Sequence, residues 1–545
     1  NLYILDMIKN IAHIIIMMTI LCSSTIQIDG QFSDWGVDST IVYFEDSILD
    51  SDGADLLNLS ITNDENFLFI KIKLDREIDL LDDFENPSDI IIQLDADNNP
   101  NTGYSVGGIG SEYGIRCLEK FVYDNTYPGD NTEPLSFMQF RALPSITSDE
   151  FEIAIGRRPF GESIFNDTIA VVIKEHHSND FIPNEGQILT FTFNDIYHEP
   201  VELIEINKEN PDLLRVMAYN TLGNGLNDND RIDRFVRIIK AIDPQIIGFN
   251  ETYQTSEEDV HDVLDVSLGG VWHVLKNDPE NITASRFPII DTWGVHNRIQ
   301  ASLIEIENEV THVLFIVGHL SCCGSDSSRQ SQVDRFTEFV LDAKTPGGEI
   351  TVLENTPIIF LGDMNLVGNS QQYHTIIEGD ILNTDTYGLG AFPDWDNTEL
   401  GDVICRQTDK RMAYTWRNDM SEYPPGRLDF IFYTNSVMSK AKSFTLQTEI
   451  MSDERLDYYG LIWDDTKEAS DHFPIVADFE LSLNNNCNLD GDINYDESIN
   501  ILDILILVDI IGSNNVVFEC ADINNDDAVN FLDIDQLVTI IFNNN

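Results

Sequence analysis

Alternating apolar and polar positions dominate the first part of the chain. Short runs of this kind occur at 57–61, 67–74, 90–94 and 189–193, and Gly, Pro and Asn clusters separate them. A side-chain period of two is the period of a half-buried strand, and turn-forming clusters are typical of antiparallel connections. We therefore predict an antiparallel β-sandwich over residues 25–205.

The pattern changes after this segment. A polar stretch at 206–212 predicts a linker, and residues 212–483 then alternate short apolar runs with helical patterns. Strands that alternate with helices predict an α/β domain. A chain of 545 residues is too long for one hydrophobic core, which agrees with a multidomain protein.

The middle domain repeats one sequence pattern six times. Each apolar run has, at one end, polar residues that can carry chemistry. These residues are Asn220, Glu251, His319, Asp363 with Asn365, Asp429, and Asp471 with His472. Because carboxylates are costly inside buried strands, we expect them together on one rim of the domain. Carboxylates that share a rim repel one another unless a cation lies between them, and oxygen donors favour a hard ion.

The ordered motifs of this domain resemble the endonuclease/exonuclease/phosphatase superfamily. They are Tyr219-Asn220, Asn250-Glu251, Gly318-His319-Leu320, Gly362-Asp363-Met364-Asn365, Arg427-Leu428-Asp429-Phe430-Ile431 and Ser470-Asp471-His472-Phe473-Pro474-Ile475. Each motif is weak alone, but together they follow the family's order through the whole domain. The resemblance implies a four-layered α/β sandwich whose site lies at one edge of two packed sheets.

The resemblance implies metal ligands and a water-activating group. Glu251, Asn220 and Asp471 would hold Mg²⁺ or Mn²⁺. Asp363, steadied by Asn365, would position or deprotonate the attacking water. The ion would polarise a phosphoryl oxygen and offset charge on the leaving oxygen.

Further roles implied by the resemblance fall on two histidines and an arginine. His472 would contact the scissile phosphate, with Asp429 fixing its tautomer, or would serve as general base; the sequence leaves both readings open. His319 would reach the phosphate or the leaving group. Arg329 is a candidate phosphate clamp.

The last part of the chain repeats a twelve-residue pattern. The copies place Asp492, Asn494, Asp496, Ser498, Asn500, Asp503 and Asp522, Asn524, Asp526, Ala528, Asn530, Asp533 at positions one, three, five, seven, nine and twelve. Oxygen ligands at this spacing wrap Ca²⁺, with position seven contributing its carbonyl. An Asx-rich turn without metal is the alternative, which two copies in register disfavour. We predict a small α-helical pair of Ca²⁺ loops.

The repeated segment, residues 487–543, resembles a type I dockerin. This resemblance implies a tethering domain with a cohesin-like scaffold protein as partner. The sequence departs from the family at position six, where Glu497 and Asp527 replace the usual glycine. Asp tolerates a left-handed backbone better than Glu, so the first loop is expected to bind more weakly.

The first domain resembles family-9-type carbohydrate-binding modules in two stretches, 28–35 and 94–103. That resemblance implies a carbohydrate partner. Asp95, Asp97 and Asn99 stand at the end of an apolar run, where they can hold a structural Ca²⁺. An Asx-rich turn without metal fits the same residues, and both readings stay open.

Charge and the first residues bear on location and substrate. The formal net charge is −64, which disfavours a protein that coats duplex DNA.

Residues 1–24 combine a lysine, an apolar run and small residues, as a signal peptide does. The run is short for a membrane span, so we expect an extracellular or cell-surface protein without stable transmembrane anchoring.

The combined expectation is a secreted, divalent-metal-dependent phosphodiesterase of nuclease-like chemistry. Its substrate would be a nucleic acid or a phospholipid headgroup. A sphingomyelinase-like phospholipase and a phosphomonoesterase are alternatives. A further alternative, from another class, is a carbohydrate-binding scaffold component whose central domain has lost activity.

Overall fold

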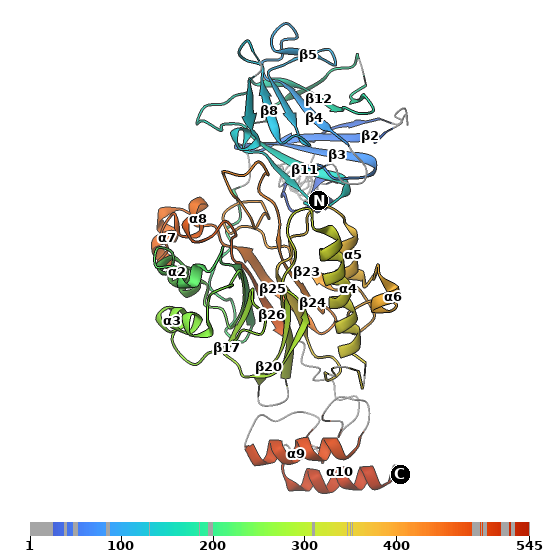
Figure 1. The fold of residues 1–545 in the computed structure, drawn as a ribbon, viewed down its shortest axis with the longest axis vertical. Helices are drawn as coiled ribbons and strands as arrows, with labels where there is room; N and C mark the ends of the chain where they lie inside the picture. Colours follow the sequence, from blue (N-terminus) through green and yellow to red (C-terminus); the bar gives the residue numbers. More distant parts are fainter. Residues whose placement is uncertain are drawn as a thin grey trace, which may run out of the picture.

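The computed structural model contains three folded parts in chain order (Figure 1). It describes residues 26–36, 41–46, 53–82, 88–129, 131–184, 186–194, 200–307, 311–345, 347–348, 350, 352–481, 491, 493, 499–513, 521, 523–524 and 529–543. The segment predicted as a signal peptide lies outside these residues. Among the described residues, no helix combines the length and apolarity needed to span a bilayer.

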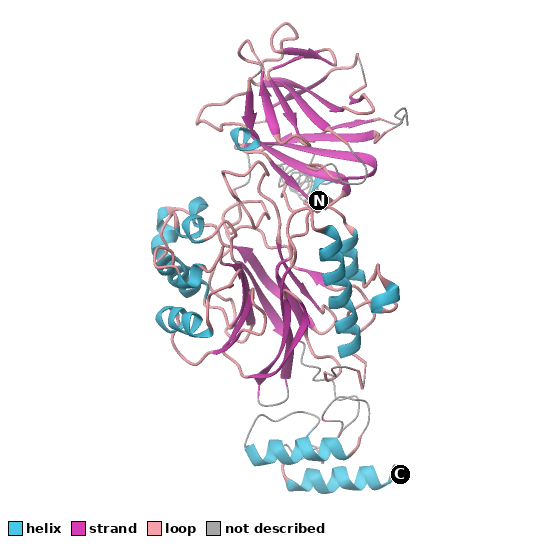
Figure 2. Cartoon of the chain, viewed as in Figure 1, coloured by secondary structure: helices cyan, strands magenta, loops and turns pink. Residues whose placement is uncertain are grey.

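The N-terminal part consists of antiparallel strands in two main sheets (Figure 2). One sheet has the order β1-β2-β3-β11-β10; the other has the order β13-β12-β4-β7-β8-β9, with β14 also pairing to β12. The strands are β1 (Val42–Glu45), β2 (Leu56–Asn63), β3 (Phe67–Ile78), β4 (Ile90–Asp95), β5 (Tyr104–Val106), β6 (Ile109–Ser111), β7 (Tyr113–Arg116), β8 (Phe121–Asp124), β9 (Thr132–Pro134), β10 (Arg141–Leu143), β11 (Ser148–Gly156), β12 (Thr168–Glu175), β13 (Asp180–Ile182) and β14 (Leu189–Thr192), with 3₁₀ turns at Ser33–Gly36 and Leu135–Met138.

A shared apolar core joins these two sheets. Leu59 and Ile61 of β2 pack in one cluster with Ile92 of β4 and Val171 of β12. Strand alternation places every second side chain on the inner face, which is why the apolar-polar pattern predicted this part of the fold. The β-sandwich expected from the sequence agrees with this arrangement.

The central part contains two six-stranded sheets. Their orders are β17-β18-β16-β15-β26-β25 and β19-β20-β21-β22-β24-β23. The strands are β15 (Leu214–Asn220), β16 (Ile246–Asn250), β17 (His273–Leu275), β18 (Asn281–Ser285), β19 (Ile289–His296), β20 (Ile299–Glu307), β21 (Thr311–His319), β22 (Ile358–Asp363), β23 (Gly401–Asp402), β24 (Asp429–Tyr433), β25 (Met438–Thr445) and β26 (Ile475–Leu481). Each sheet holds one parallel pair, β15 with β16 and β21 with β22.

Helices cover the outer faces of both sheets (Figure 1). The helices are α2 (Ile232–Ile242), α3 (Glu257–Ser267), α4 (Asp326–Ala343), α5 (Gln371–Glu378), α6 (Thr384–Tyr387), α7 (Asp453–Tyr459) and α8 (Asp465–Ala469), with 3₁₀ turns at Gly225–Asn227 and Thr448–Ile450. On α2, Phe235, Ile238 and Ile242 recur at helical spacing and are buried. The inner sheet faces meet in a separate core that includes Val216 and Phe315. The result is helix, sheet, sheet, helix: four layers.

The C-terminal part consists of two helices, α9 (Ile501–Ser513) and α10 (Phe531–Asn543), which lie side by side at the opposite end from the sandwich (Figure 1). Asp503 and Asp533 are equivalent positions of the two repeats. Each accepts backbone N–H groups of its own loop, from Ile493 and Asn500 in the first copy and from Asn524 and Asn530 in the second.

Most of the expected Ca²⁺ ligands cannot be placed. Asp492, Asn494, Asp496, Ser498, Asp522, Asp526 and Ala528 lie outside the described residues. The calcium-loop interpretation therefore stays a prediction.

The stretch predicted as a linker packs on the central domain. Ile206 is fully buried in the core beneath α2, and its carbonyl accepts a hydrogen bond of 2.7 Å from the Arg215 guanidinium. Ile204 donates its N–H to the Thr408 carbonyl. The linker prediction for residues 206–212 was wrong at Ile206. The polar residues that follow it gave no sign that Ile206 is buried in the core.

Sandwich and central domain share an apolar cluster. Ile28 and Leu143 on the sandwich side pack with Met412, Tyr414 and Phe473 of the central domain. Backbone hydrogen bonds cross the same boundary at Ile28, whose N–H and carbonyl pair with the 411–413 segment. The two parts therefore form one packed unit.

Candidate active site

Six chain segments bring the predicted site residues to one edge of the two central sheets. Asn220, His319 and Asp363 are the last residues of β15, β21 and β22, and Asp429 is the first of β24. His319 is the register partner of Asp363, which in turn faces Asp429 across the antiparallel pair. The carboxyl ends of the parallel strands and the start of their antiparallel neighbour meet at this rim, as the sequence pattern predicted.

An amide links the two sheets at this rim. The Asn220 side-chain N–H₂ donates to Glu251 Oε1 at 3.2 Å and to Asp363 Oδ2 at 2.9 Å. Glu251 directly follows β16 and accepts the Gly223 N–H at 2.8 Å with its other oxygen. Asn220 is fully buried, so its orientation is set by these two carboxylates.

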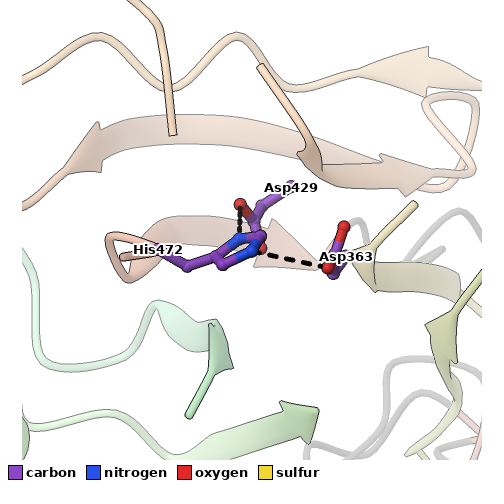
Figure 3. Close-up of side chains that lie close together, drawn as sticks. All are labelled: Asp363, Asp429 and His472. Carbon is purple, nitrogen blue, oxygen red and sulfur yellow. Dashed lines mark hydrogen bonds and ion pairs between the residues drawn. The ribbon is translucent and has the colours of Figure 1, made fainter. Parts of the chain in front are cut away.

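A histidine-carboxylate pair stands beside Asp363 (Figure 3). The His472 Nδ1 lies 2.8 Å from Asp429 Oδ2, and the His472 Nε2 lies 3.6 Å from Asp363 Oδ2. Thr415 donates its hydroxyl to the same Asp429 oxygen at 2.7 Å. Burial opposes charge on His472, but Asp429 and Asp363 outweigh it and raise the pKa of His472 to about 10.

A second histidine reaches Asp363 from β21. The His319 Nδ1 forms an ion pair of 2.8 Å with Glu280, and its Nε2 lies 3.7 Å from Asp363 Oδ2. Burial would lower the pKa of His319, yet Glu280 and Asp363 hold it above its ordinary value. Both histidines can therefore present a proton toward an anion bound next to Asp363.

Neighbouring amides fix the Asp363 loop. The Asn250 side-chain oxygen accepts the Asp363 N–H at 3.0 Å, and its amide nitrogen donates to the Gly318 carbonyl at 3.0 Å. Asn365 has a left-handed backbone with φ of 46°, donates its N–H to Asp363 Oδ1 and donates its side chain to the Leu320 carbonyl. The predicted steadying of Asp363 by Asn365 is thus a backbone hydrogen bond.

The donor set at the rim fits a hard divalent ion. Glu251 offers carboxylate oxygens, whereas Asn220 turns its amide nitrogen toward Glu251 and Asp363 and accepts the Leu222 N–H at 3.0 Å with its oxygen. Asp471 Oδ2 accepts the Trp416 indole N–H at 3.2 Å, while its Oδ1 is buried and accepts no hydrogen bond. A buried carboxylate oxygen without a donor requires a cation or water as partner. Ligand atoms of Asp363, Asp429 and His472 also lie within 4.8 Å of one another, but the imidazole already uses Nδ1 on Asp429.

Arg329 lies inside the protein rather than at the rim. It is fully buried on α4, and its guanidinium donates to five protein acceptors, on Gln372, Ser321, Cys323, Asp326 and Val367. No donor is left for a phosphate. Its burial and its five hydrogen bonds argue against the phosphate-clamp prediction for Arg329.

Sequence reasoning missed several supporting groups. Glu280 and Thr415 each contact a histidine or its partner carboxylate, and Trp416 contacts Asp471. Glu280 had a usable signal, since it directly precedes β18, whose first residue pairs with the end of β16 at the same rim. Thr415 and Trp416 lie in a loop without strand periodicity, so no sequence pattern pointed to them.

Comparisons with known proteins concern this central part of the chain. Residues 217–472 match the model of the Endonuclease/Exonuclease/phosphatase family. No match to the chain is found among curated proteins.

Several solved structures are similar to about half of the chain. They include TDP2 of D. rerio complexed with single-strand DNA product (15% identity, 49% of this chain and 99% of that chain, TM-score 0.32), ANGEL2, a 2′,3′-cyclic phosphatase (15%, 50% and 98%, 0.34), and a mannosyl-6-phosphatase of Bacteroides thetaiotaomicron (16%, 49% and 100%, 0.32).

The motif order, the two-sheet architecture and the family match agree on one assignment. Residues 217–472 are a domain of the endonuclease/exonuclease/phosphatase family, a family of metal-dependent phosphoric ester hydrolases.

Proposed function

We propose that the chain is a phosphodiesterase of nuclease-like chemistry. The observation that carries the proposal is the pair of carboxylate-supported histidines, His319 and His472, whose Nε2 atoms lie 3.7 and 3.6 Å from the same Asp363 oxygen. Two protonated imidazoles can contact two oxygens of one phosphoryl group. That favours a substrate in which a poor alkoxide leaving group needs stabilisation.

Each residue then has a defined task. A divalent ion held by Glu251 and Asp471, beside Asn220, would polarise a phosphoryl oxygen and offset negative charge on the leaving oxygen. Asp363 orients the attacking water, because Asn250 and Asn365 fix its backbone and carboxylate.

The histidines complete this arrangement. His472 donates a hydrogen bond to the phosphoryl group from Nε2, while Asp429 holds its Nδ1 and favours its charged form. His319 does the same from the other side with Glu280. Both imidazoles stabilise charge that develops as the phosphorus–oxygen bond breaks.

The net charge of the chain bears on the class of substrate. A net charge of −64 repels a long duplex, so we propose short or single-stranded nucleic acid, or a phospholipid headgroup, as the substrate class. A sphingomyelinase-like activity is the competing assignment, because His319 and the missing basic footprint suit it. A phosphomonoesterase and an inactive scaffold component complete the alternatives.

We further propose that the enzyme is exported and tethered. Support comes from the signal-like residues 1–24 and from the in-register Asp503 and Asp533 of the C-terminal repeats. A cohesin-like protein and a carbohydrate are the partners to test. Binding of Ca²⁺ by the repeats is part of the same proposal.

The test is a substrate panel with the purified full chain. Single-stranded DNA, duplex DNA, RNA, sphingomyelin and phosphate monoesters are assayed with Mg²⁺, with Mn²⁺ and with EDTA. We expect metal-dependent cleavage of phosphodiesters and little release of phosphate from monoesters. Faster turnover of monoesters than of every diester would overturn the phosphodiesterase assignment, and no turnover of any substrate would favour the scaffold alternative.

A further inference from the structure

Two adjacent cysteines, Cys322 and Cys323, stand near the rim and take no part in the proposed reaction. They follow β21 in the loop that leads to α4, shortly after His319. Both are exposed, and their thiols are hydrogen-bonded to each other. Neighbouring side chains in an extended strand point to opposite faces, so this contact requires a different backbone. Cys323 has such a backbone, with a left-handed φ of 62°.

The other cysteines in the described part of the chain are not placed to pair with these two. Cys117 is buried in the core of the sandwich, and Cys405 is buried between the two central sheets. Cys22, Cys487 and Cys520 lie outside the described residues. Within the described structure, each of the two exposed thiols therefore has its own neighbour as the cysteine it can reach.

The loop that carries the two thiols is anchored to the protein interior. The fully buried Arg329 donates to the carbonyls of Ser321 and Cys323 at 2.8 and 2.7 Å. Just before them, Leu320 donates its N–H to the Asp363 carbonyl at 3.0 Å. Because the two carbonyls are held in place, a change in the backbone between them acts on the neighbouring contact with Asp363.

Adjacent thiols in contact can close into a disulfide ring. We propose that Cys322 and Cys323 are a site of reversible oxidation, at which a low-molecular-weight disulfide converts the two thiols into a vicinal disulfide and slows the enzyme. One thiolate attacks the small disulfide, forms a mixed disulfide and releases one small thiol; the second protein thiol then displaces the other small thiol. The chain loses two electrons and two protons, which leave with the two small thiols.

Such a ring is suited to reversible chemistry. Adjacent Cα atoms are about 3.8 Å apart, which is closer than the Cα atoms of ordinary disulfides. A strained and exposed disulfide is reduced more readily than a structural one. The pair is therefore a site that responds to the surrounding thiols rather than a permanent cross-link.

The order of the two steps follows from the surroundings of each thiol. Partial burial and the hydrogen bond with Cys323 raise the pKa of Cys322 to about 11. A thiol that resists deprotonation is a poor attacking group. Gly324 leaves the space beside Cys323 open, since an added Cβ there would meet no atom within 4 Å beyond its chain neighbours. We therefore assign the first attack to Cys323 and ring closure to Cys322.

The test treats the reduced full chain with glutathione disulfide and maps its peptides by mass spectrometry. We expect the peptide with both cysteines to become lighter by two hydrogen atoms, and dithiothreitol to restore it. Cys322→Ser should instead accumulate a glutathione adduct at Cys323. Cys323→Ser should react severalfold more slowly, because burial still disfavours the Cys322 thiolate. An unreacted wild-type pair, a cross-link to any other cysteine, or equal rates in the two variants would overturn the proposal.

The effect on catalysis rests on the proposed function and is read separately. Oxidised wild type should turn over a diester at least roughly 10-fold more slowly than the reduced protein, because small displacements of positioned groups are costly. The double variant Cys322→Ser/Cys323→Ser should keep its turnover after the same treatment. Unchanged turnover of the fully oxidised protein would overturn the coupling to Asp363. A reduced protein without turnover would contradict the proposed function, whereas the peptide masses would still report on the cysteine pair.

Discussion

The Asp429 carboxylate holds His472, the histidine to which we assign contact with the phosphoryl group. It starts β24, is 1% exposed, and holds His472 Nδ1 and the Thr415 hydroxyl on one oxygen. This hydrogen bond directs His472 Nε2 toward Asp363 and keeps the imidazole charged. Asp429 is thus a positioning residue for His472.

Replacing Asp429 with asparagine should impair the reaction without unfolding the protein. We expect Asp429→Asn to lower the turnover number by about 10²–10⁴-fold, the usual range for loss of a general acid–base arrangement. The pKa of His472, followed by NMR in EDTA, should fall from about 10 toward its ordinary value. Asp265→Asn, an exposed change on α3, should alter neither quantity; an unchanged pKa in Asp429→Asn would remove its assigned role.

The sequence predicted the site residues at strand ends but not the residues that hold them in place. Asn220, Asp363 and Asp429 were found because a buried strand can carry a polar group cheaply only at its end. Glu280 was missed although it stands just before the first residue of β18, much as Asp429 begins β24. Arg329 was misread because its spacing from His319 says nothing about burial.

Among the elements, the parallel pair of β21 and β22 places the carboxylate of Asp363. Gly362, with φ of +135°, lets the two strands approach at the residue before Asp363. A Cβ at this position would stand 2.0 Å from the Gly318 carbonyl oxygen and 3.1 Å from Asn250 Oδ1. The same Asn250 holds the Asp363 N–H, so backbone spacing and site geometry are coupled here.

Alanine at position 362 should damage both stability and activity. We expect Gly362→Ala to reduce the free energy of unfolding by about 1–3 kcal/mol, from strain and crowding, and to reduce activity further by displacing Asp363. Chemical denaturation measures the first effect. Gly388→Ala is the matched control, since Gly388 also has positive φ but nothing lies within 4 Å of its added Cβ. Equal losses in both variants would show that conformation alone, not contact with β21, matters.

Periodicity predicted most elements and failed where burial was not periodic. The apolar face of α2 repeats at helical spacing, so that face could be predicted. Ile206 ends the short run Leu203-Ile204-Glu205-Ile206, which shows no clear period, so its burial beneath α2 could not be predicted. The pairing order of the twelve central strands also required the structure, because neighbours such as β15 and β26 are distant in sequence.

Across the whole molecule, the sandwich supports the active site. Phe473, next to His472, and Tyr414, next to Thr415, lie in the apolar cluster shared with the sandwich. A cavity of about 240 Å³ near Ser145 and Arg427 lies along the same boundary. The resemblance of the first domain to carbohydrate-binding modules did not predict this contact with the central domain.

Unfolding should therefore couple the two parts. Leu143, on the sandwich side, is 2% exposed in this cluster, and Leu143→Ala should cost about 2–5 kcal/mol. We expect sandwich and central domain to unfold in one transition, and Leu143→Ala to lower the temperature at which β26 amides lose hydrogen-exchange protection. Two separate transitions, with only the sandwich affected by Leu143→Ala, would contradict the coupling.

The rim of the two central sheets is the proposed active site of a metal-dependent phosphoester hydrolase. Its most direct test is phosphodiester hydrolysis by Glu251→Gln over a Mg²⁺ titration, beside wild type and Glu258→Gln, an exposed change on α3. We predict that wild type and Glu258→Gln have equal, EDTA-sensitive activity. Glu251→Gln should lose at least about 10²-fold of that activity while unfolding at the same denaturant concentration. Wild-type turnover by Glu251→Gln, or wild-type activity unaffected by EDTA, would contradict the assignment of the rim as the metal-bearing active site.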